Sequence, residues 1–171
     1  MKKILYLFLL SPLFLYSQIE NFSIVNNQIL WQKVYESKLT KSEVIHLLKS
    51  SNKFSELSDN ENTIYGATQN LKVDFKRFSN YPSIYVQHTT VISKFIIDFK
   101  ENKYRVTVKD IVVHDPGQNN HILRDINLER YGLKNKNTEF NNRFIDTNAK
   151  FYDYTFFNLF HFDNEKDTQD W

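Results

Sequence analysis

The sequence contains no cysteine, and its only methionine is Met1. Without cysteine the chain cannot form disulfides, thiolate metal sites or a cysteine nucleophile. It also lacks the residue to which lipoproteins attach their lipid at the signal cleavage site. We therefore expect a domain that is held together by its hydrophobic core alone, without thiol chemistry and without a lipid anchor.

Glycine is also scarce, and the motifs that depend on it are missing. Gly66, Gly117 and Gly132 stand far apart, so the chain has neither a dinucleotide-binding nor a phosphate-binding glycine loop. The HExxH and GxSxG motifs of metalloproteases and serine hydrolases are absent as well. We expect no cofactor, and no motif assigns a catalytic residue.

The N-terminus is typical of a cleaved export signal. Lys2 and Lys3 precede an apolar run of 13 residues, Ile4–Tyr16, which ends at Ser17. A membrane-spanning helix needs roughly 20 residues, and a proline in this run would interrupt a helix. The alternatives are a buried strand or an uncleaved anchor. We predict a signal peptide at residues 1–17.

Removal of this segment leaves a chain without excess charge. The two lysines account for the difference between 22 Lys+Arg and 20 Asp+Glu, so the mature chain would have 20 of each. A neutral chain lacks the positive charge that drives binding to nucleic acids. We expect a periplasmic or secreted protein that is not a lipoprotein, with no nucleic-acid partner and no stable membrane span after cleavage.

Local patterns predict the first elements of the mature chain. Ile24–Tyr35 alternates as one strand. Thr40 is followed three residues later by Glu43, which makes a capping box and predicts a helix over 41–51. Polar residues 59–62 predict a turn.

Further alternation predicts the middle of the sheet. Apolar residues at 71, 73 and 75 indicate a half-buried strand, which Pro82 ends before another strand begins near Ile84. Residues 95–108 predict a hairpin that turns at Glu101–Asn102. In this register Phe99 faces Tyr104, and Asp98 faces Arg105 in a pair of opposite charge.

The C-terminal part predicts one long helix. Residues 118–144 are polar and read as an irregular connection with at most one short element. Asp146 or Thr147 can cap a helix whose apolar stripe comprises Ala149, Tyr152, Phe156, Leu159 and Phe160. We predict a single domain over 18–162 and a frayed acidic tail over 163–171.

Two short sequences resemble a known family. Trp31–Tyr35 (WQKVY) precedes the helix that begins near Thr40, and Phe99–Val106 (FKENKYRV) forms the hairpin. These segments are similar to a family of exported bacterial proteins of unknown function whose members have a TATA-binding-protein-like fold. The similarity covers about residues 28–113. Glu101–Asn102 stands where the family usually has an acidic residue and glycine, and asparagine tolerates the positive φ of such a turn.

The resemblance and the patterns together predict an α+β fold. We expect one curved antiparallel sheet of about four or five strands with two helices on one face, in the order β-α-β-β-β(-β)-α. The family has no assigned catalytic residues, and the name of its fold does not imply DNA binding.

Two groups of residues are candidate sites. The first is a polar cluster, which could hold a divalent metal or supply an acid and a base, although its spacing matches no ligand motif: His114, Asp115, His121, Arg124 and Asp125. The second is a set of aromatic residues off the apolar stripe of the last helix, which form a partner-binding patch unless they are buried: Phe151, Tyr154 and Phe157.

Export, neutral charge and missing motifs favour a non-catalytic interaction module that binds a protein or another component of the cell envelope. The alternative is a metal-dependent or acid/base hydrolase that uses the cluster of residues 114–125. A nucleic-acid binder would need a basic face that the overall charge does not predict.

Overall fold

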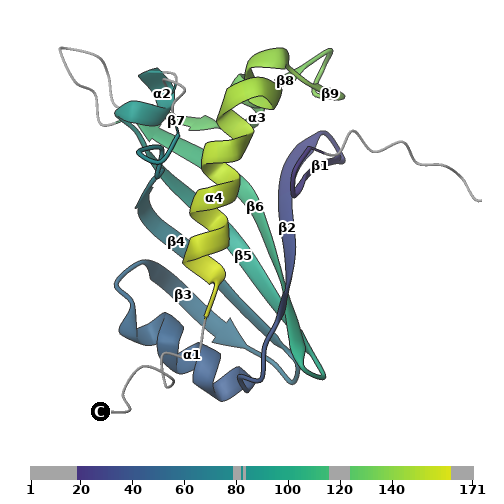
Figure 1. Ribbon diagram of the computed structural model, residues 1–171, viewed down its shortest axis with the longest axis vertical. Coiled ribbons are helices and arrows are strands. Elements are labelled where there is room, and N and C mark those ends of the chain that lie inside the picture. The colour runs from purple at the N-terminus through teal and green to yellow at the C-terminus, as the bar shows by residue number, and fades with distance from the viewer. Residues whose placement is uncertain (1–18, 79–81, 83, 116–123, 163–171) are drawn as a thin grey trace, which may run out of the picture.

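Most strands of the described chain belong to one antiparallel sheet. The computed structural model describes residues 19–162 except 79–81, 83 and 116–123. Within them, seven strands pair in the order β1-β2-β6-β5-β4-β3, and β7 pairs with the end of β6 (Figure 1). Their bounds are β1 (Phe22–Val25), β2 (Gln28–Glu36), β3 (Phe54–Asp59), β4 (Thr63–Lys72), β5 (Thr90–Lys100), β6 (Lys103–Asp115) and β7 (Arg124–Asn127).

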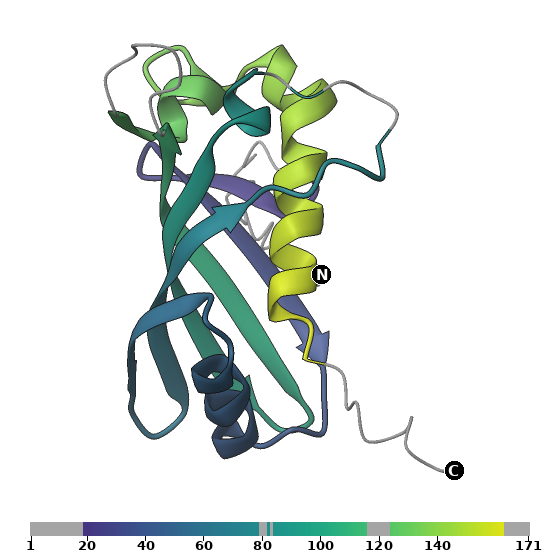
Figure 2. The same ribbon diagram turned by 90° about the vertical axis from the view of Figure 1, so that its left-hand side faces the viewer.

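Two long helices pack on one face of this sheet. Figure 2 shows α4 running along one side of the sheet, with α1 near its lower end. Both helices contribute to the same hydrophobic core. The helices and the remaining small elements are α1 (Lys41–Ser50), α2 (Ile84–Gln87), α3 (Glu129–Gly132), the two-stranded β8 (Leu133–Lys134) and β9 (Glu139–Phe140), a π-helical turn η1 (Phe144–Asn148) and α4 (Ala149–Phe160).

The α+β class with one large antiparallel sheet is as predicted. The sheet has more strands than the expected four or five, and the short helices α2 and α3 add to the two predicted helices. One reason lies in the segment predicted as a single strand from Ile24. Asn26 and Asn27 both have positive φ, 51° and 62°, and turn the chain into the β1–β2 hairpin. Asparagine adopts this conformation more readily than other residues with a side chain.

The first helix begins where the capping box predicts. The Thr40 side chain accepts a hydrogen bond from the Glu43 backbone, and the Glu43 carboxylate accepts one from the Thr40 backbone. Val44 and Leu48 are the buried residues of α1. The helix thereby covers the lower end of the sheet.

The predicted strand over 71–76 is wrong in its position. The strand is β4, which ends at Lys72; Val73 is buried and Phe75 half-buried outside the sheet. The next strand begins at Thr90 rather than near Ile84, which lies in α2. The apolar alternation of these residues reflects their burial against the core and does not show that they belong to a strand.

The β5–β6 hairpin has the predicted register. Phe99 pairs with Tyr104 and Asp98 with Arg105, and Asn102 turns the chain with a φ of 55°. Arg105 donates to Asp98 at 2.8 Å. Alternating apolar residues and one pair of opposite charge were enough to determine this pairing.

The connection before the last helix is more structured than predicted, since it contains β7, α3, β8 and β9. The last helix is also capped differently. The side chain of Asn141 accepts from the Phe144 backbone at 2.8 Å, so the helical segment begins before Asp146 and Thr147. The predicted apolar stripe of α4 is buried as expected.

Aromatic side chains fill the space between α4 and the sheet. Phe160 contacts Trp31, Phe95 and Phe54, with ring centroids 5.1 to 6.4 Å apart. Gly66 leaves room for this packing, because a Cβ there would lie 2.5 Å from the Phe95 ring.

Hydrogen bonds fix α4 on the sheet. Asp153 accepts from the Trp31 indole at 2.8 Å and from the Asn21 amide at 2.6 Å. The Tyr35 hydroxyl donates to the carbonyl of Phe157. Burial, with smaller effects of Tyr104 and Asp153, raises the pKa of Tyr35 far above that of a free tyrosine. Its hydroxyl therefore stays protonated and remains a donor.

The predicted signal peptide (1–17) and acidic tail (163–171) lie outside the described residues. Among the helices of the described part, none has both the length and the apolar character needed to cross a bilayer.

Candidate functional site

The face of the sheet opposite α1 and α4 is here called the outer face. Residues that are paired across strands point to the same face of a sheet, so the register defines this surface. It includes five cross-strand rows: Gln32–Thr107–Ile96–Tyr65, Val34–Arg105–Asp98–Thr63, Lys109–Lys94–Ala67, Asn127–Val112–Ile92 and Asp125–His114–Thr90–Lys72.

Apolar side chains stay exposed on this face. Among the described residues, five large hydrophobic residues are exposed, and Val34, Tyr65 and Ile92 of these lie on the outer face. None of the three belongs to a candidate site predicted from the sequence. The sequence does contain a signal for their exposure, because each alternates with the buried residues of its strand. That they form one surface depends on the strand register, which the sequence pattern does not give.

The structure brings together part of the predicted polar cluster. His114 Nδ1 lies 2.6 Å from Asp125 Oδ1, because β6 and β7 pair these residues directly. Asp115 and Arg124 are paired by their backbones in the next register position. His121 lies outside the described residues.

The His114–Asp125 pair has part of the geometry of an acid/base site. A carboxylate on Nδ1 orients an imidazole and leaves Nε2 available to another group. Thr90 is the cross-strand neighbour of His114, and this position would suit a nucleophile. However, Thr90 Oγ1 is buried and forms no hydrogen bond with the described residues. The contact that would activate this hydroxyl is therefore not made.

No metal centre is evident in the described part of the chain, where no three His, Asp or Glu side chains converge. A structural zinc site would need about four ligands. In the described part of the 114–125 cluster, two such side chains, His114 and Asp125, are in contact. Two groups fit an acid/base pair better than a metal site.

A hollow of about 760 Å³ lies beside the cross-strand row that contains His114 and Thr90. It is formed by the chain that leaves β4 and by the segment between α2 and β5, and Lys72 and Thr90 belong to both the hollow and the row. Val73 and Val86 provide apolar walls, and His88 is exposed at its edge. Its size suits a small ligand.

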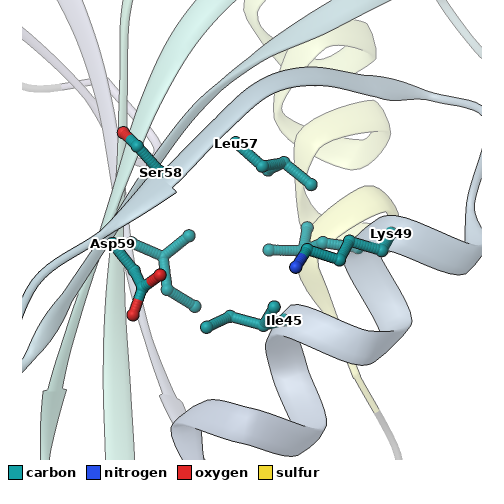
Figure 3. A pocket seen from close by; sticks show the side chains of 7 residues that line it. Ile45, Lys49, Leu57, Ser58 and Asp59 are labelled. Carbon is teal, nitrogen blue, oxygen red and sulfur yellow. The ribbon is translucent and has the colours of Figure 1, made fainter.

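A second hollow lies between α1 and β3 (Figure 3). Ile45 and Leu57 line it, and Asp59 at its edge binds Lys41 at 2.6 Å. Its volume of about 30 Å³ holds one or two water molecules and excludes a ligand of ordinary size.

No protein-family model and no curated protein matches the chain. Two solved structures share its architecture. A TBP-like protein from Parabacteroides distasonis has a TM-score of 0.51 and 19% identity, over 80% of this chain and 90% of that chain. A DUF4468 family protein from Bacteroides ovatus has a TM-score of 0.50 and 12% identity, over 87% of this chain and 95% of that chain.

The chain has a TATA-binding-protein-like fold. The fold that the sequence resemblance implied is thereby confirmed, and its neighbours include a protein from a family of unknown function. Identities of 19% and 12% show the fold alone, so neither structure assigns an activity to this chain.

The three residues of the predicted aromatic patch differ in how far they are buried. Phe151 is only 1% exposed and packs against Phe78, with ring centroids 5.0 Å apart. It is therefore not available to a partner. Tyr154 and Phe157 are half-buried, and each carries a cation over its ring, Arg77 and Lys33 respectively.

Proposed function

We propose that the protein is an exported, non-catalytic interaction module that binds a protein of the cell envelope through the outer face of its sheet. The observation that supports this function is the exposure of Val34, Tyr65 and Ile92 on a face that α1 and α4 leave open. Apolar groups interleaved with charged ones are typical of surfaces that bind proteins reversibly.

Export supports the same function. The charged start and short apolar run before Ser17 indicate passage into the periplasm or out of the cell. The mass of the protein purified from its native cells tests this step. A mass that begins at Gln18 supports cleavage, and a mass that still includes Met1–Ser17 refutes it.

The outer face can be tested with two matched isoleucines. Ile92 on the outer face and Ile145 in η1 are 37% and 38% exposed. We expect Ile92→Glu to abolish cross-linking of the purified protein to its envelope partner, because a charge would be buried at the interface. Ile145→Glu should leave cross-linking unchanged. Equal loss in both variants, with circular dichroism showing both folded, contradicts the proposed surface.

A second candidate function, an acid/base hydrolase, is favoured by one observation, the 2.6 Å contact between His114 and Asp125. An imidazole held this way acts as a general base in hydrolysis. Hydrolysis of p-nitrophenyl acetate by the wild type and by His114→Gln separates the two functions. Equal rates support the interaction module, and a rate that falls at least about tenfold in the variant supports the enzyme.

A further inference from the structure

One end of the outer face contains a hollow to which three cationic side chains contribute. It has a volume of about 220 Å³ and lies between two cross-strand rows, next to the β5–β6 turn. Arg105 and Val34 stand on one side, Lys100 and Lys103 stand on the other, and the β6 backbone at Tyr104 lies between them.

Among the described residues that line the hollow, Asp98 is the only carboxylate, and it contacts Arg105. Asp98 Oδ2 accepts from the Arg105 guanidinium at 2.8 Å, and Asp98 Oδ1 accepts from Thr63 at 3.3 Å. Both oxygens of Asp98 are thus engaged, and the guanidinium is held in one orientation. A guanidinium has five N–H donors, so Arg105 keeps donors for a second carboxylate.

The two lysines are placed unfavourably for the protein alone. Lys100 and Lys103 are direct cross-strand partners at the end of the hairpin, and like charges in this position destabilise a sheet. Glu36 of β2 faces Lys103 on its other side, so the like-charge contact acts mainly on Lys100. Among the described residues, neither lysine forms an ion pair with a carboxylate. A negative group between them would remove this repulsion.

We propose that this hollow binds a glutamate or aspartate side chain of an acidic segment in the partner protein. The carboxylate lies between Arg105, Lys100 and Lys103, and the neighbouring apolar residue of the segment covers Val34, which is 50% exposed. The inference rests on the proposed function, because it names the chemistry of the partner that the outer face binds.

A protein segment fits this site better than a nucleic acid. The cations lie around one small hollow, and the adjoining row carries Gln32, Ile96 and Tyr65, which are uncharged. This row separates the hollow from Lys94 and Lys109, and Lys94 is paired with Asp110. A nucleic-acid site would need a continuous track of positive charge along the face. The mature chain is neutral as a whole.

Two short fluorescein-labelled peptides test the site, one of alternating valine and glutamate and one in which glutamine replaces glutamate. We expect fluorescence polarisation to show at least about fivefold tighter binding of the glutamate peptide. In about 1 M NaCl, which screens charges beyond about 3 Å, this preference should disappear. Equal binding of both peptides at low salt overturns the proposal.

Variants distinguish a binding role of the lysines from a structural one. Lys100→Gln and Lys103→Gln should each weaken binding of the glutamate peptide about fivefold. The melting temperature should be unchanged or higher in Lys100→Gln and close to that of the wild type in Lys103→Gln, which also loses the opposite charge of Glu36. Lys150→Gln, an exposed lysine on α4, makes the same charge change elsewhere and should bind as the wild type. Wild-type binding by both hairpin variants overturns the proposal.

The outcomes separate this site from the proposed function. Loss of envelope cross-linking in Ile92→Glu, together with wild-type peptide binding in the lysine variants, leaves the outer face as the interaction surface and refutes the carboxylate site. Tighter binding of a short DNA duplex than of the glutamate peptide refutes both and identifies a nucleic-acid surface.

Discussion

The two faces of the sheet differ in what keeps their side chains in place. On the inner face, Phe95 and Trp31 are buried beneath α4 among other aromatic rings. On the outer face, β5 and β6 carry Lys94 and Arg105, which are exposed and paired with Asp110 and Asp98. The first face stabilises the fold, and the second can change its residues at little cost in stability, so it is free to serve binding.

The largest expected effect comes from truncating the inner face. Phe95→Ala should lower the free energy of unfolding by about 3 to 5 kcal/mol, since it removes a buried ring and leaves a cavity. Val34→Ala on the outer face should cost less than about 1 kcal/mol. Urea denaturation of both variants measures the difference. Similar losses would contradict the division of roles between the faces.

A smaller loss is expected where the inner face has no spare room. Gly66→Ala places a Cβ 2.5 Å from Phe95 and 2.8 Å from Leu57, and overpacking of this kind costs about 1 to 3 kcal/mol. Combining it with Phe95→Leu should recover part of the loss, because the shorter side chain makes room for the methyl group. Additive losses in this double-mutant cycle would show that the two sites are not in contact.

Tyr35 gives the inner face a dependence on pH. Because burial raises its pKa, the folded protein keeps the proton above about pH 10, where a tyrosine in the unfolded chain loses it. The unfolded state then binds fewer protons, so the free energy of unfolding falls as the pH rises. Tyr35→Phe should cost about 1 kcal/mol at pH 7 through the lost bond to Phe157.

In Tyr35→Phe, the free energy of unfolding should also fall less steeply as the pH rises above about 10. Tyr152→Phe should act in the same direction, because burial raises the pKa of Tyr152 as well. Urea denaturation at pH 8 and pH 11 measures both slopes. An unchanged slope in both variants would show that other groups govern alkaline unfolding.

The smallest effect has the opposite sign and concerns the outer face. Thr90 Oγ1 is buried without a hydrogen bond to the described residues. Valine has the same shape, so Thr90→Val should raise the free energy of unfolding by up to about 1 kcal/mol. Thr68→Val on the inner face is the control and should be destabilising, because its hydroxyl bonds to Ser93. Destabilisation by both substitutions would mean that Thr90 has a partner in solution.

How much of the fold the sequence predicts depends on how local the signal is. The β5–β6 hairpin and α1 follow from neighbouring residues, the first from alternation and the second from Thr40 and Glu43. The β1–β2 hairpin was missed because two asparagines make its turn where glycine is usual. β3 was missed because it is a polar edge strand with a bulge at Glu56, whose φ is 53°.

The candidate sites needed information that no local pattern holds. His114 and Asp125 were identified as candidates from their closeness in sequence, but their contact depends on the pairing of β6 with β7. Phe151 was expected on a second side of the helix, and only the position of Phe78 shows that this side is covered. Val34, Tyr65 and Ile92 come from three strands and form one surface only through the register.

Asp153 joins the two ends of the described chain. Its carboxylate accepts from Asn21 and Trp31, which lie 132 and 122 residues earlier. A growing chain therefore cannot complete the core around Trp31 until the ribosome has added α4. Contacts this distant in sequence also form slowly. The core around Trp31 is thus completed only after nearly the whole described chain has been synthesised.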